Sequence, residues 1–215
     1  MATRFRYIVV EGPIGVGKTS LATRLADEYG SGLILEKSEE NPFLANFYQN
    51  QRQYALSTQL HFLLQRAQQA QGFRQTDLFK SSHIADFMVD KDPLFAELTL
   101  DNDELALYRQ IYQHVTFEAP KPDLVIYLQA PVATLRERIV RRGIIYEQNI
   151  RDDYLLKLSE IYTRFFYDYD DSALLTVNTQ SVDLINNGDD YQAILEKINN
   201  IHYGRHYFNQ SSFAY

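Results

Sequence analysis

The chain reads FRYIVVEGPIGVGKTSLATRLADEY from residue 5 to residue 29. The apolar run 5–10 predicts a buried strand, and the leucines and the tyrosine of residues 18–29 recur at helical spacing. Between them, residues 12–19 match the pattern G-x-x-x-x-G-K-[ST], which functions only after a strand and before a helix. This stretch therefore predicts a phosphate-binding loop in an α/β protein.

The loop offers the contacts that a nucleoside triphosphate requires. Glycines let the backbone approach a phosphate closely, while the amide groups and the helix N-terminus supply partial positive charge. Lys18 reaches the β- and γ-phosphates, and the hydroxyl of Thr19 can ligate Mg²⁺. We predict that ATP and Mg²⁺ bind here, with contacts from Gly12, Gly15, Val16, Gly17, Lys18, Thr19 and Ser20.

The rest of the chain alternates short apolar runs with longer segments of helical periodicity. Strands are expected at 5–10, 33–35, 82–87, 123–129 and 174–177, and helices at 18–29, 54–70, 104–117, 132–142, 152–167 and 191–201. Such alternation predicts a parallel sheet with helices on both faces. The expected fold is therefore α/β, a three-layer sandwich of the P-loop NTPase type with a five-stranded parallel sheet flanked by helices.

Length and composition limit the possible functions. The 215 residues are expected to form one domain, 1–215, whose tail 203–215 is either packed on the surface or disordered. The net charge of 21 − 28 = −7 disfavours binding of a nucleic acid polymer, and the absence of cysteine excludes disulfides and cysteine-based zinc sites. No segment has the ~18 apolar residues that a membrane span needs. We therefore expect a soluble cytoplasmic protein without a membrane partner.

A phosphate loop alone does not identify the acceptor. The chain is short for a motor ATPase and lacks the Asn-Lys-x-Asp signature of GTPases, which favours a small-molecule kinase. Glu36 follows the second expected strand, at the sheet edge where ligands bind in open α/β folds. A carboxylate there can accept the proton of an attacking hydroxyl. Its position alone does not distinguish this role from a solvated acidic loop.

Six ordered stretches resemble the deoxynucleoside kinase family, which includes deoxycytidine, deoxyguanosine and deoxyadenosine kinases. They are EGPIGVGKTSLA (11–22), LEKSEENPFLANFY (35–48), TQLHFLLQR (58–66), DKDPLFA (90–96), PDLVIYLQAP (122–131) and RERIVRRGIIYEQNI (136–150). The resemblance implies ATP-dependent phosphorylation of a deoxynucleoside 5′-hydroxyl, a reaction of nucleotide salvage.

The resemblance also implies how the acceptor is held. Glu36 matches the general base for the 5′-hydroxyl, while Tyr48 and Glu147 match the residues that hold the sugar 3′-hydroxyl. Two polar groups on one hydroxyl disfavour acceptors that lack it.

Recognition of the base is assigned in the same way. Gln59 and Arg66 lie seven residues apart, on one face of the expected helix, and match a glutamine and an arginine that read the base. Asp92 matches the aspartate that pairs with this arginine. Within the family, such a charge pair fits the branches that accept purine deoxynucleosides or deoxycytidine better than the thymidine kinases, which have apolar groups there, so the resemblance implies the same preference here.

A basic cluster made of Arg136, Arg138, Arg141 and Arg142 ends at Gly143. Arg138 and Arg142 share a helix face. They match the lid arginines that clamp the transferred phosphoryl group, whose charge such residues stabilise. The resemblance therefore assigns them catalytic roles and implies a lid over about residues 138–149.

One departure from the family pattern follows the third strand. The family usually has an acidic residue, then arginine and serine, whereas this chain has Asp86, Phe87 and Met88. Asp86 matches the acidic residue, which contacts Mg²⁺ through water. Phe87 cannot replace the arginine, which touches the phosphate and the general base. Either Lys37, Lys91 or a lid arginine substitutes, or phosphoryl transfer is weaker.

Two alternative functions follow from these observations. A nucleoside monophosphate kinase, such as a thymidylate kinase, would need a further arginine for the substrate phosphate. A catalytically weak nucleotide-binding subunit would account for the missing arginine. The leading function and its alternatives differ in the small molecules that bind.

The resemblance also implies a homodimer, formed through the helices at 54–70 and 104–117.

Overall fold

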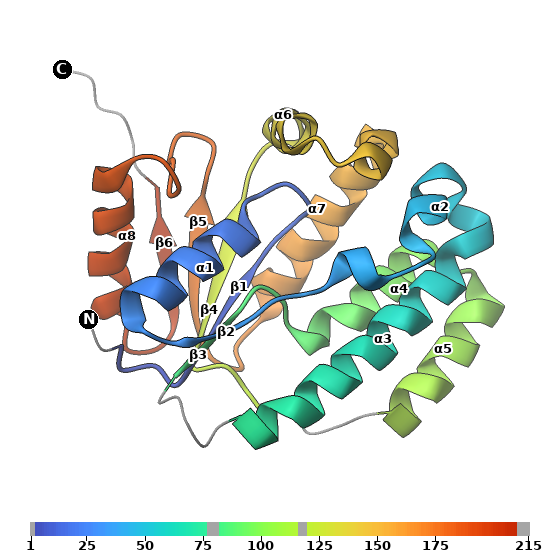
Figure 1. Cartoon of the computed structure of the whole chain (residues 1–215), viewed down its shortest axis with the longest axis horizontal. Helices are drawn as coiled ribbons and strands as arrows, with labels where there is room; N and C mark the ends of the chain where they lie inside the picture. Colours follow the sequence, from blue (N-terminus) through green and yellow to red (C-terminus); the bar gives the residue numbers. More distant parts are fainter. Residues whose placement is uncertain (1–2, 77–81, 116–119, 210–215) are drawn as a thin grey trace.

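Among the residues that the structure describes, six parallel strands form one sheet in the order β2-β3-β1-β4-β5-β6 (Figure 1). The computed structural model describes residues 3–76, 82–115 and 120–209. The strands are β1 Tyr7–Glu11, β2 Gly32–Ile34, β3 His83–Ala85, β4 Leu124–Gln129, β5 Ala173–Asn178 and β6 Arg205–Phe208. The predicted α/β class and parallel sheet are confirmed, and the expected number of five strands is corrected to six.

The helices lie in two layers, one on each side of the sheet (Figure 1). They are α1 Lys18–Tyr29, α2 Leu44–Gln49, α3 Gln51–Thr76, α4 Asp92–Thr99, α5 Asn102–Val115, α6 Val132–Arg142, α7 Asp152–Asp168 and α8 Gly188–Asn199, with 3₁₀ turns η1 Ser38–Glu40, η2 Val89–Lys91 and η3 Ile145–Asn149. Tyr191 of α8 donates its hydroxyl to the Arg24 carbonyl of α1, which places these helices together. On the other side α4 packs against α3, α5 and α7.

The central strands form the core because their side chains are apolar on both faces. Ile8, Val125 and Ile126 are fully buried. On the α7 side, Tyr127 stacks on Phe166 with ring centroids 4.3 Å apart. This packing holds the carboxyl end of β1, from which the phosphate loop begins.

The sixth strand comes from the tail that the sequence left undecided. Residues 205–208 pair in parallel with β5, beginning with Leu174 opposite Arg205. Arg205 also donates hydrogen bonds to the carbonyls of Phe166 (2.8 Å) and Tyr169 (2.5 Å). This part of the tail is therefore packed, while residues 210–215 lie outside the described part of the chain.

The phosphate loop packs tightly against β4 and α6. Gly12 has φ +149°, and a Cβ atom there would lie 2.4 Å from the Leu128 carbonyl oxygen. Gly15 has φ +82°, and its Cβ would lie 2.8 Å from the Leu135 carbonyl oxygen. Both positions therefore require glycine for conformation and for space.

Within the described ranges, the structure contains no helix with the length and apolar character needed to traverse a bilayer.

Candidate active site

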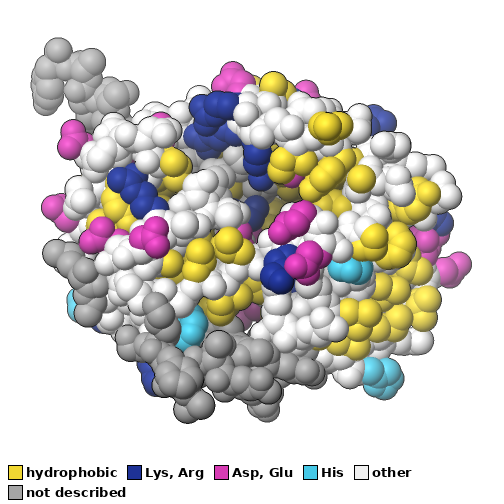
Figure 2. All heavy atoms as spheres, viewed as in Figure 1, with side chains coloured by type: hydrophobic (Ala, Val, Ile, Leu, Met, Phe, Trp, Pro, Cys, Tyr) yellow, Lys and Arg dark blue, Asp and Glu magenta, His cyan; other side chains and the backbone are white. Residues whose placement is uncertain are grey.

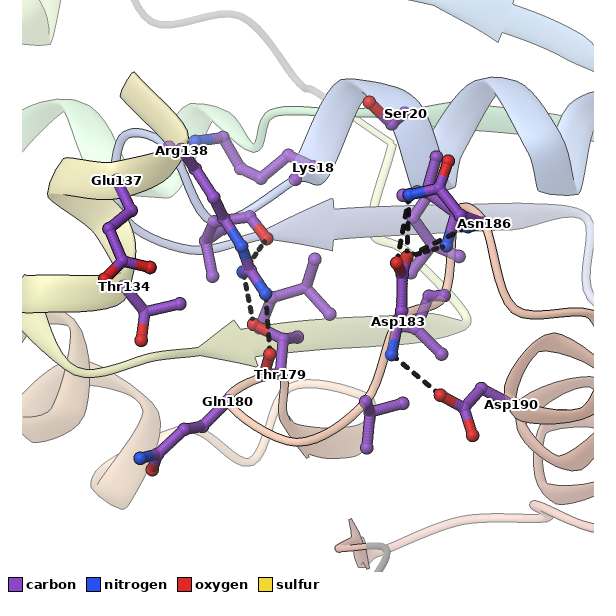
Figure 3. Close-up of a pocket in the computed structure, with 18 of the residues that line it drawn as sticks. Lys18, Ser20, Thr134, Glu137, Arg138, Thr179, Gln180, Asp183, Asn186 and Asp190 are labelled. Atoms are coloured by element: carbon purple, nitrogen blue, oxygen red, sulfur yellow. Dashed lines mark hydrogen bonds between the residues drawn. The ribbon is translucent and has the colours of Figure 1, made fainter. Parts of the chain in front are cut away.

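A cavity of about 760 Å³ lies over the phosphate loop, between α6 and the segment 179–187 (Figure 3). Its size lies within the range of small-molecule sites. Six of the seven predicted ATP-binding residues line it, namely the consecutive residues Gly15 to Ser20. Gly12 lines a second cavity on the other side of Lys18. We call the first the donor cavity and the second the acceptor cavity.

Arg138 connects the segments that line the donor cavity. From α6 it points toward Thr179, donating to the Thr179 hydroxyl at 2.8 Å and carbonyl at 2.7 Å (Figure 3). A further bond of 3.2 Å reaches the Val16 carbonyl of the phosphate loop. Figure 2 shows Lys and Arg side chains gathered around a hollow near the top of the same view, where α6 lies in Figure 1. The predicted lid arginine thus joins three parts of the site.

Lys18 lines both cavities. Its ammonium donates to the carbonyls of Gly12 (2.8 Å) and Pro13 (3.3 Å) within the same loop. Burial lowers the pKa of Lys18, and the like charge of Lys91 acts in the same direction. The lysine side chain is therefore held at the junction of the two cavities.

The two predicted Mg²⁺ contacts lie next to each other. The Thr19 hydroxyl donates to one Asp86 oxygen at 2.5 Å, and the Glu36 amide donates to the other at 2.7 Å. Burial raises the pKa of Asp86, while the Thr19 and Glu36 hydrogen bonds oppose that effect. A hydroxyl and a carboxylate therefore converge beside the phosphate loop, and such oxygen ligands suit Mg²⁺.

The acceptor cavity brings together residues from four separate segments. Five of the six predicted acceptor residues line it, namely Glu36, Tyr48, Gln59, Arg66 and Glu147. The sixth, Asp92, does not line the cavity but forms an ion pair with Arg66. The volume of the acceptor cavity is about 110 Å³.

Arg66 joins two carboxylates in the interior of the protein. One nitrogen pairs with Asp92 and another with Glu36, and the Arg66 and Asp92 side chains are only 5% and 2% exposed. Asp92 is also the first residue of α4, ahead of Pro93. The Arg66 guanidinium lies 5.0 Å from the Phe62 ring. Asp92 therefore begins a helix and also holds Arg66.

Glu36 carries its charge close to three cations. Burial acts to raise the pKa of the Glu36 carboxyl, but Lys91, Arg66 and Lys18 outweigh it and hold that pKa at about 2. The carboxylate is thus ionised at neutral pH, as a proton acceptor must be.

The predicted sugar-binding residues lie at the other end of the acceptor cavity. Tyr48 of α2 stacks on Tyr146 of η3, with ring centroids 6.2 Å apart. Glu147, also in η3, forms an ion pair with Arg142 of α6. Arg142 lines both cavities, so it lies where a group passing from donor to acceptor would be. Burial raises the pKa of Tyr48 well above its usual value, which keeps its hydroxyl a donor.

The structure distinguishes between the candidates for the missing cation beside Glu36. Lys91 is buried, lines the acceptor cavity and lies 3.3 Å from Glu36. Lys37 is 55% exposed and pairs with Glu40 at 2.9 Å. Phe87, which occupies the arginine position, is buried 6.0 Å from Arg66.

Sequence reasoning assigned no role to Glu11, although it ends the first apolar strand. Its side chain is fully buried and pairs with Lys91 at 3.0 Å. A carboxylate at the end of a buried strand, one residue before the loop, was the available signal. Thr179 and Asp183, which line the donor cavity, had no such signal because their segment is irregular.

Comparisons with known proteins show which family the chain resembles over its length. A family model described as deoxynucleoside kinase matches residues 8–202. The deoxyguanosine kinase of Bacillus subtilis is 36% identical over 193 residues, covering 87% of this chain and 93% of that protein. The deoxyguanosine kinase of Lactobacillus johnsonii is 30% identical over 205 residues, covering 89% and 90%.

The fold has a close counterpart among solved structures. A deoxyadenosine kinase from M. mycoides, with the products dCMP and a flexible dCDP bound, has a TM-score of 0.79 at 24% identity, covering 91% of this chain and all of that one (100%). The resemblance seen in the six sequence stretches is confirmed. Because the family model matches from β1 to beyond the end of α8, the chain belongs to the deoxynucleoside kinase family and is a kinase of deoxynucleosides.

Proposed function

We propose that this kinase transfers the γ-phosphoryl group of ATP to the 5′-hydroxyl of a purine deoxynucleoside or deoxycytidine, in preference to thymidine. The buried Arg66–Asp92 pair beside Glu36 carries this proposal. The Arg66 guanidinium lines the cavity and presents hydrogen-bond donors to a base edge, while its ion pair with Asp92 holds the guanidinium in place. The relatives named deoxyguanosine kinase support a purine acceptor, and deoxyguanosine is the acceptor to test first.

Glu36 is the proposed general base. It accepts the proton of the 5′-hydroxyl as the bond between that oxygen and the γ-phosphorus forms. The bond from the γ-phosphorus to the oxygen that bridges to the β-phosphate breaks, and ADP keeps that electron pair. Lys18, Arg138 and Arg142 stabilise the charge on the transferring group, as the position of Arg142 between the cavities supports.

Mg²⁺ is proposed to bind at Thr19 and Asp86, whose side-chain oxygens meet beside the phosphate loop. In kinases the ion commonly takes one or two protein oxygens along with substrate phosphates. When bound, it neutralises charge on the phosphate oxygens.

The acceptor cavity is expected to open for its substrate. Its volume of about 110 Å³ is smaller than the roughly 300 Å³ at the lower end of small-molecule sites. The ion pair between Arg66 and Glu36 joins two of its walls. We propose that the nucleoside separates this pair and that residues 138–149, at the end of α6 and in η3, move as a lid.

An acceptor panel tests the proposed function. The protein with Mg-ATP is given deoxynucleosides, ribonucleosides and their monophosphates, and ADP release is measured. We expect turnover with deoxyguanosine, deoxyadenosine or deoxycytidine, with kcat/KM at least about tenfold above thymidine, since unpaired buried polar groups penalise a mismatched base. Turnover with monophosphates alone would indicate a nucleotide kinase, and nucleotide binding without turnover a binding subunit.

We also propose a homodimer formed through α3 and α5. Leu64 on α3 is 50% exposed and Leu107 on α5 is 46% exposed, and Figure 2 shows hydrophobic side chains over this side of the molecule. Light scattering is expected to give twice the chain mass. Leu64→Arg with Leu107→Arg should give the monomer mass, whereas Leu33→Arg, on the edge strand β2, should not. A wild-type monomer contradicts the proposal.

The cytoplasmic location expected from the sequence is likewise proposed, and cell fractionation would test it.

A further inference from the structure

Lys91 is a buried lysine that lies between two carboxylates. Its side chain is 3% exposed, and its ammonium is 3.0 Å from Glu11 Oε1 and 3.3 Å from Glu36 Oε1. A second contact of 3.5 Å reaches Glu36 Oε2. Lysine is rarely buried unless it is paired. Its position is therefore determined by these carboxylates.

Glu11 holds Lys91 from outside the lining of the acceptor cavity. Its fully buried carboxylate accepts hydrogen bonds from the Gly12 amide (2.8 Å), the Met88 amide (3.2 Å) and the Tyr162 hydroxyl (2.9 Å). Met88 precedes the turn η2 that carries Lys91. Glu11 therefore connects the start of the phosphate loop to the turn from which Lys91 extends.

Arg66 and Lys91 differ in what else they bind. Arg66 also pairs with Asp92 and lines the cavity from α3, so a nucleobase that meets this pair competes with Glu36 for the guanidinium. Lys91 has Glu11 as its other partner, which lies outside the lining of the cavity. Among the cations of the described residues, Lys91 is thus the one whose contact with Glu36 does not depend on the base.

We propose that Lys91, held by Glu11, is the positioning residue of Glu36: its ammonium keeps the carboxylate directed at the acceptor hydroxyl when Arg66 turns to the nucleobase. The inference rests on the proposed function, because it assigns Glu36 the role of proton acceptor. It also explains how this chain functions with Phe87 in the place of an arginine: the positive charge comes from residue 91 instead.

The test compares Lys91→Met with Lys91→Arg and with Lys37→Met. Lys37→Met is the control, because Lys37 is an exposed lysine that pairs with Glu40. With Mg-ATP and the best acceptor of the wild type, Lys91→Met should lower kcat about 10- to 100-fold, because misplacing a reacting group costs this much. KM for the acceptor should change less than about threefold, since base contacts are kept. Lys91→Arg should recover at least part of kcat, and Lys37→Met should match the wild type.

A folding control keeps the result interpretable, because Lys91→Met leaves two buried carboxylates without a cation. The double variant Glu11→Gln with Lys91→Met removes one charge of each sign and should remain folded by circular dichroism, with kcat as low as in Lys91→Met.

Two results would overturn the inference alone: a folded Lys91→Met protein with wild-type kcat, or a kcat loss in Lys91→Met that Lys91→Arg does not reduce at all. A wild-type protein that turns over no acceptor would instead overturn the proposed function and, with it, this inference.

Discussion

Glu36→Gln is expected to lower kcat about 10²- to 10⁴-fold, the usual contribution of a general base. Glutamine keeps the size of the side chain and an oxygen that Arg66 and Lys91 can bind, but it cannot accept the proton of the 5′-hydroxyl. Acceptor affinity should therefore change little while the chemical step slows. Single-turnover measurements of phosphoryl transfer, with acceptor binding followed by calorimetry, separate the two.

Glu40→Gln is the matched control for this variant. Glu40 lies in the same segment, 52% exposed, and pairs with Lys37. Its substitution should leave kcat within about twofold of wild type, since exposed ion pairs contribute little. A Glu36→Gln protein that keeps more than a tenth of the wild-type rate would show that another group accepts the proton.

Arg66→Met is expected to affect both stability and catalysis. It leaves the Asp92 side chain, 2% exposed, without its cation. Breaking a buried ion pair in this way costs about 3–5 kcal/mol of unfolding free energy. Loss of the contacts to the base should also lower kcat/KM about 10³-fold, given a cost of roughly 4 kcal/mol for unmatched polar groups.

The double variant Arg66→Met with Asp92→Asn separates the two effects. It removes both charges of the pair, so the double variant should recover most of the lost free energy of unfolding, measured with denaturant, while kcat/KM stays low. Arg52→Met is the control on the same helix, because Arg52 is 63% exposed and pairs with Asp101 and Glu104 at the surface. It should cost less than about 1 kcal/mol. A double variant no more stable than Arg66→Met would refute the assigned pairing.

The elements around the phosphate loop were predictable because their signals are local. The helix 18–29 and the helix 132–142 have the bounds that the sequence predicts, each ending at a glycine in left-handed conformation. By contrast, β6 is a short edge strand of polar and aromatic residues, half of them exposed, which shows no apolar run. Helix α4 has eight residues, and its first residue, Asp92, was predicted only as the partner of Arg66.

Prediction of the acceptor site depended on the family resemblance, because its residues come from separate elements. Tyr48, Arg66 and Glu147 meet in one cavity, but periodicity relates residues only within one element. The sequence left three candidates for the cation beside Glu36. The contact between Lys91 and Glu11 identifies Lys91 among them. These two residues lie far apart in the chain, so no local sequence pattern predicts that they pair.

The strand order has a consequence for how the chain folds. β1 occupies an interior position, and its neighbours are encoded far downstream: Tyr7 pairs with His83, and Ile8 with Leu124. Such non-local pairing slows folding, because long loops must close before contacts form. On a ribosome the loop that grips triphosphate would stay without its sheet until more than half of the polypeptide had emerged. We therefore expect ATP to stabilise the finished protein while leaving the rate at which it first folds unchanged.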